Sequence, residues 1–80
     1  MRDLRVYISN VGVEGRGQGA TFYSQRADGP YYRWVYVEGA GHWRYSRVSL
    51  DRLQLNVLCV ARWEAVPAAL RDRLGEHYLE

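Results

Sequence analysis

The sequence predicts a small α+β domain, in which a four-stranded antiparallel meander carries a C-terminal helix or kinked helix pair on one face. Three observations lead to this prediction. The first half of the 80-residue chain alternates short β-forming segments with turns that contain Gly or Pro. Residues 49–66 lack both Gly and Pro, which favours a helix there. Pro67 then precedes a segment with helical spacing, and proline suits the first position of a helix.

Four segments of the first half are expected to be strands: residues 4–8, 21–25, 31–37 and 42–48. The first alternates apolar and polar side chains, and residues 31–37 are dense in aromatic and β-branched types. Turns at residues 27–30 and 39–41 separate the last three segments. Their order along the chain is typical of an antiparallel meander.

The second half is expected to be helical. Ser49 is a good N-cap for a helix over residues 50–64, with Asp51 in its first turn. The alternative is a fifth strand across Leu53, Leu55, Val57 and Cys59, which gives five strands plus one C-terminal helix. In the second helix, three side chains line one face (Leu70, Leu74 and Tyr78), and Gly75 weakens its end by about 1 kcal/mol relative to Ala.

Register decides which side chains face the core, because a slip of one residue exchanges the two faces of a strand. We take residues 27–30 as a four-residue loop and residues 39–41 as a three-residue loop. One face then carries Phe22, Val35, Val37, Trp43 and Tyr45, and we assign it to the core. The opposite, open face carries Tyr23, Tyr32, Trp34, Tyr36, His42 and Arg44. An even number of residues in the second loop would move Trp43 and Tyr45 to the other side.

Composition describes one globular domain over residues 1–80. Hydrophobic residues make up 48% of the chain and charged residues 25%, as in ordinary globular proteins. A chain this short buries roughly 60–65% of the surface that its unfolded form exposes. The core is therefore thin, and a second subunit would add stability. The stripe Leu55, Cys59 and Trp63 on the predicted first helix is the expected homo-oligomer interface.

Few residues suggest catalysis or a cofactor. The only histidines, His42 and His77, read as a strand residue beside a turn and a late helical surface residue. Two histidines and one distant cysteine do not supply the three or four ligands of a metal site. The glycine-rich residues 12–19 precede a strand rather than a helix, which makes them a hairpin or binding loop rather than a phosphate loop. We expect no enzyme, no metal and no cofactor.

All eleven basic residues are Arg, and the net charge is only +2. Residues 1–49 hold seven Arg against four acids, so the first half carries the positive charge. The predicted order of four strands and a helix resembles the outline of single-stranded-DNA-binding transcriptional coactivators, which act as dimers. This resemblance implies a nucleic-acid partner, although the present strands lack the Lys that such binders carry.

These observations predict a non-enzymatic, self-associating interaction module that binds a protein partner through the aromatic and Arg face, since Trp, Tyr and Arg are enriched at interface hot spots. The alternative is a single-stranded nucleic-acid binder, with bases stacked on Tyr32, Trp34 and Tyr36 and phosphates held by Arg33, Arg44 or Arg47. The longest apolar run, residues 57–61, is too short to span a bilayer. The first residues lead into no signal-peptide run, so we expect no membrane and a cytoplasmic location.

Overall fold

A computed structural model describes residues 3–9, 21–37 and 39–78 of the chain. The described residues form one five-stranded antiparallel sheet in the order β4-β3-β2-β1-β5. Its strands are β1 (Leu4–Ser9), β2 (Phe22–Arg26), β3 (Tyr31–Val37), β4 (His42–Val48) and β5 (Leu58–Val60). The helical elements are α1 (Arg52–Asn56), the 3-10 turn η1 (Trp63–Ala65) and α2 (Ala68–His77). This α+β fold is the five-strand, one-helix alternative.

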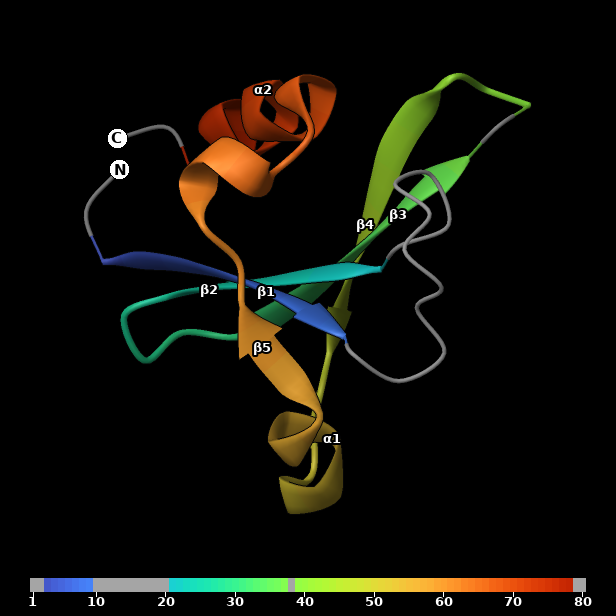
Figure 1. Ribbon diagram of the computed structural model, residues 1–80. Coiled ribbons are helices and arrows are strands. Elements are labelled where there is room, and N and C mark those ends of the chain that lie inside the picture. The colour runs from blue at the N-terminus through green and yellow to red at the C-terminus, as the bar shows by residue number, and fades with distance from the viewer. Residues whose placement is uncertain (1–2, 10–20, 38, 79–80) are drawn as a thin grey trace.

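The four strands predicted in the first half are confirmed to within one residue. β1 and β2 pair over five positions, from Leu4 opposite Arg26 to Ile8 opposite Phe22. β3 and β4 pair along their whole lengths. In Figure 1, α2 lies over one face of this sheet, and α1 lies at the far end of β5 on the side away from α2.

The predicted helix over residues 50–64 is wrong. Asp51, not Ser49, caps a helix of only five residues, through a reciprocal capping box with Gln54. The chain then extends, and Leu58–Val60 pair with β1, so that Cys59 lies opposite Ile8. The Ala61 amide continues this contact by donating to the Val6 carbonyl at 2.8 Å. Pairing with the edge of β1 therefore overrides the helical periodicity of the segment.

The hydrophobic core lies between the sheet and α2. Its buried side chains are Val6, Phe22, Trp34, Trp43, Val66, Leu70, Leu74 and Tyr78. The predicted inward face of the second helix is confirmed, because Leu70, Leu74 and Tyr78 are all buried. Phe22 meets Trp43 edge to face, with ring centroids 5.7 Å apart. The helix continues past Gly75 to His77.

Both predicted hairpin registers are wrong by one residue. Phe22 pairs with Trp34 rather than Val35, because Ala27 adopts a left-handed conformation (φ 53°) and the Gly29 amide donates to the Arg26 carbonyl. Trp43 pairs with Tyr36 rather than Val37, because the turn is closed by the pair Val37–His42 rather than by His42 with the next residue, and Gly41 is left-handed (φ 68°). The two shifts leave β2 and β4 on their predicted faces and turn β3 over.

Candidate functional site

The sheet has one face that α2 does not cover, which we call the open face. Side chains alternate between the two sides of a strand, so the neighbours of the buried residues point away from α2. The register then places the following residues on the open face: Arg5, Tyr7, Ser9, Tyr23, Gln25, Tyr31, Arg33, Val35, Val37, His42, Arg44, Ser46, Val48, Leu58 and Val60. This face is the first candidate site.

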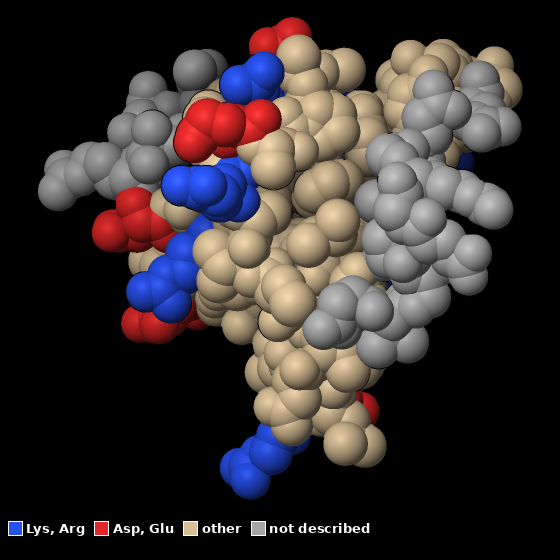
Figure 2. Space-filling model, viewed as in Figure 1, with Lys and Arg blue, Asp and Glu red and all other residues tan. Residues whose placement is uncertain are grey.

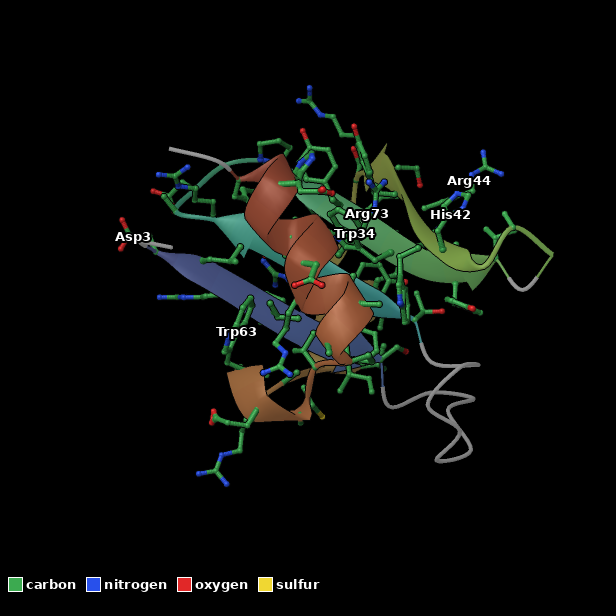
Figure 3. The ribbon with its side chains drawn as sticks, turned by 90° about the horizontal axis from the view of Figure 1, so that it is seen from above. Asp3, Trp34, His42, Arg44, Trp63 and Arg73 are labelled. Atoms are coloured by element: carbon green, nitrogen blue, oxygen red, sulfur yellow. The ribbon has the colours of Figure 1, made fainter. Side chains whose placement is uncertain are left out.

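Only half of the predicted partner-binding residues lie on the open face. Tyr23, His42 and Arg44 are there, as predicted. The other three are a correction: Tyr32, Trp34 and Tyr36 face α2, and Trp34 is only 1% exposed. Figure 3 shows Trp34 beneath α2 beside Arg73, whereas His42 and Arg44 lie far from the helix on β4. Two residues that were predicted to lie in the core, Val35 and Val37, lie instead on the open face. Val35 is 39% exposed.

A row of side chains crosses the open face from one edge of the sheet to the other. Cross-strand pairing places Val60, Tyr7, Tyr23, Arg33 and Ser46 in this order on five neighbouring strands. Arg33 Nε donates to Tyr23 Oη at 3.2 Å, and its guanidinium carbon lies 5.5 Å from the centroid of that ring. The rings of Tyr7 and Tyr31 lie 6.3 Å apart, although β2 runs between their strands. Three tyrosines and an arginine thus form one contiguous group.

Positive charge predominates among the described residues of the open face, although Asp3 and Asp28 line a hollow together with Arg5 and Gln25 at its end. Arg5, Arg33 and Arg44 lie on this face, and the described strands contain no Asp or Glu at all. The described acids lie instead in turns and helical elements: Asp3, Asp28, Asp51, Glu64, Asp72 and Glu76. Within the described part of the chain, none of the three open-face arginines has a carboxylate at ion-pair distance. Their charge is therefore available to an anionic partner.

A second candidate site lies on the other side, between α2 and β4. A groove of about 250 Å³ is lined by Trp34, Tyr45, Arg73, Glu76 and His77. The His77 ring lies 4.5 Å from that of Tyr32 and 4.6 Å from that of Tyr45, centroid to centroid. It is half-buried among these rings, so its predicted place on the helix surface is wrong. Burial, and then the nearby Arg73 charge, lower the pKa of His77.

The groove at His77 does not resemble a catalytic site. Catalysis by a histidine base needs a nucleophile or a positioned water within reach. The side chains around His77 are instead aromatic rings and the Arg73–Glu76 ion pair, whose charged atoms are 3.3 Å apart. His42 is an exposed strand residue beside a turn, as predicted, and its Nδ1 lies 3.2 Å from the Ala40 carbonyl oxygen.

A third surface, which we call the apolar segment, runs from α1 through β5 to η1. It exposes Leu53 (77%), Leu55 (38%), Val60 (72%) and Trp63 (40%), together with Cys59. The predicted interface residues Leu55, Cys59 and Trp63 are thus exposed, but they lie on three elements rather than on one helical stripe. Figure 2 shows a broad uncharged area in the centre of the view, with most charged side chains gathered along one side and others at its lower, α1 end.

The described residues contain no group of three or more His, Cys, Asp and Glu side chains placed to hold a metal ion. None of their helices has the length and apolar character needed to cross a membrane. The glycine-rich residues 12–19, considered above as a hairpin or binding loop, lie outside the described residues.

The chain was also compared with known proteins. No protein family, no curated protein and no solved structure matches it.

Proposed function

We propose that this chain is a non-enzymatic interaction module that self-associates through the apolar segment. The observation that carries the proposal is the exposure of Leu53, Leu55, Val60 and Trp63 within eleven consecutive residues (53–63). Exposed apolar side chains concentrated in one short segment of a small protein are typical of a contact surface. The proposal keeps the interface predicted from Leu55, Cys59 and Trp63 and extends it to Leu53 and Val60.

Helix α1 supports a partner at this place. It has five residues, and none of them is buried. An isolated helix shorter than about 12–15 residues is only marginally stable in water, because the entropy lost in forming the first turn exceeds the stabilisation from the hydrogen bonds of that turn. The capping box contributes about 1 kcal/mol, which alone does not hold such a helix. Burial of Leu53 and Leu55 against another surface would supply the missing stabilisation.

A second copy of the chain fits the apolar segment better than it fits the open face. An isologous contact brings each surface against itself. Four exposed apolar side chains of this segment can meet those of a second copy, and its exposed charged residues, Arg52, Arg62 and Glu64, are of both signs. Two open faces would instead bring Arg5, Arg33 and Arg44 against the same three arginines, which electrostatic complementarity disfavours. We therefore assign self-association to the segment from α1 to η1.

Self-association is tested by sedimentation equilibrium at micromolar concentrations. The expected result is a mass that is a multiple of the 9.3 kDa monomer. Leu53→Lys and Val60→Lys should each weaken association by about 2 kcal/mol or more, as interface hot-spot changes do. Val35→Lys is the matched control, because it places the same charge at an exposed apolar position on β3 and should leave the mass unchanged. A wild-type chain that sediments as a monomer would refute the proposal.

A further inference from the structure

We infer that the open face binds single-stranded nucleic acid, with unpaired bases on its tyrosines and phosphates on its arginines. This inference rests on the tyrosines and arginines of the open face, whereas self-association rests on the segment from α1 to η1; the two surfaces meet at Val60, which lies opposite Tyr7. Its key observation is the combination of Tyr7, Tyr23 and Tyr31 with three arginines on a sheet whose described strand residues include no acid.

The tyrosines are placed as a stacking platform. They come from the three neighbouring strands β1, β2 and β3, and Tyr7 lies directly opposite Tyr23. All three are half-buried, so each ring is supported by its neighbours and keeps part of its surface exposed. With strands about 4.8 Å apart, the row from Val60 to Ser46 spans about 19 Å, enough for more than one base. Rings of this kind stack on every base, because every base has a π-face.

The arginines are placed to neutralise a backbone that follows this platform. Arg33 lies next to the rings and is held by its hydrogen bond to Tyr23 Oη. The described residues provide no hydrogen-bond partner for its two terminal nitrogens, which can then take a phosphate in a bidentate manner. Arg5 and Arg44 are exposed on β1 and β4, one on each side of the tyrosine group. The positive charge therefore extends across the sheet.

The arginines and the tyrosines together indicate which kind of partner fits the open face. A duplex keeps its bases stacked inside, where the tyrosines cannot reach them. A protein partner can also contact Tyr and Arg, but it does not present one flat ring and one negative charge in every repeating unit. Single-stranded RNA or DNA uses both, since it offers one phosphate and one unstacked base per nucleotide. Neighbouring polar side chains, among them Gln25 and Ser46, can hydrogen-bond to base edges.

The test is fluorescence anisotropy of the full chain with a labelled mixed-sequence single strand, in RNA and DNA forms, from about 50 mM salt upward. We expect binding that weakens with salt, and weaker binding to the duplex of the same sequence. Tyr7→Leu and Tyr23→Leu should each lower affinity about fivefold to hundredfold, which is the loss of one base–aromatic stack. Arg44→Gln should lower the slope of log affinity against log salt by about 0.7.

Arg47→Gln is the matched control for Arg44→Gln. Both arginines are exposed on β4, but Arg47 pairs with Tyr32 and lies on the side that α2 covers. The control should leave the salt slope unchanged, and its fold can be checked by circular dichroism. The inference is overturned if no strand binds at low salt, or if Arg44→Gln and Arg47→Gln have equal effects. Tighter binding of poly-glutamate than of either strand would also overturn it. The sedimentation experiment remains independent of all three outcomes.

Discussion

Ser24 shows how a single polar residue organises the core. It is fully buried on β2, where its Oγ accepts a hydrogen bond from Trp34 Nε1 at 2.9 Å. The same oxygen lies 2.8 Å from Tyr78 Oη in a second hydrogen bond. Burial raises the pKa of Tyr78, and the Ser24 contact opposes part of that rise. One hydroxyl thus joins β2, β3 and the end of α2.

Replacing Ser24 with Ala should destabilise the fold by about 2–4 kcal/mol, because two buried polar partners lose their hydrogen bonds at about 1–3 kcal/mol each. Urea denaturation measures this loss. Ser46→Ala is the matched control, since Ser46 is exposed on β4 and should change stability by less than about 0.5 kcal/mol. Equal unfolding midpoints for the two variants would show that the buried hydrogen bonds contribute nothing.

At the scale of elements, α2 serves both the core and the edge of the sheet. Leu70 and Leu74 point into the core, while Arg73 Nε donates to the Trp43 carbonyl on β4 at 3.2 Å. His77 ends the helix and contacts rings from β3 and β4. A charged histidine normally benefits from the dipole at a helix C-terminus. Here burial and Arg73 outweigh that benefit and lower its pKa.

The lowered pKa of His77 makes stability depend on pH. In the unfolded chain His77 titrates at about 6.5, so below that pH the unfolded state binds a proton that the folded state resists. The contribution of His77 to the free energy of unfolding is therefore complete above about pH 6.5. It is lost as the pH falls towards the lower pKa that His77 has in the folded state. Thermal unfolding at about pH 8 and pH 5 should show a smaller drop in Tm for His77→Gln than for the wild type.

His42→Gln is the control for this titration. His42 is exposed on the other face of the sheet, and its loss removes the same titratable group without touching the aromatic cluster. The His42→Gln chain should keep the wild-type drop in Tm between the two pH values. If the His77→Gln variant shows the same drop in Tm as the wild type, His77 does not determine the sensitivity of the fold to acid.

At the scale of the whole molecule, the fold is a sheet covered on one face by a single ten-residue helix. Both strand tryptophans lie under that helix, at 1% (Trp34) and 3% (Trp43) exposure. A domain of this size is stable by only about 5–15 kcal/mol in total, so each large core residue carries a sizeable share. The opposite face contributes little to this core.

The assignment of faces is tested by two adjacent residues of β3. Trp34→Ala should cost about 3–5 kcal/mol, which would unfold much of the population. Val35→Ala, one position along and on the open face, should cost well under half as much, because Val35 is already 39% exposed. Urea titrations of the two variants measure the difference. Comparable losses would mean that β3 does not separate a core side from an open side.

From the sequence, the first four strands and the C-terminal helix could be located along the chain. Only some residues of the candidate site could be assigned to the correct face of the sheet. Gly and Pro positions marked the first four strands, and apolar spacing marked the buried face of α2. Tyr23, His42 and Arg44 were placed on the open face correctly, since β2 and β4 kept their predicted sides. The other members of the tyrosine group, Tyr7 and Tyr31, were missed. Tyr7 could have been predicted to lie on the open face, because it follows the buried Val6 in an alternating strand.

Contacts between distant parts of the chain determine which side of β3 is buried. They also determine whether residues 50–64 form a helix or a strand. Both sides of β3 are apolar enough for a core, so the choice depends on loops whose length differs by one residue. Trp34 is placed inward where its indole nitrogen reaches Ser24, a contact between residues ten positions apart. Leu58–Val60 become a strand through pairing with β1, some fifty residues earlier. Local periodicity carries no information about such distant partners, and their hydrogen bonds outweigh a weak helical preference.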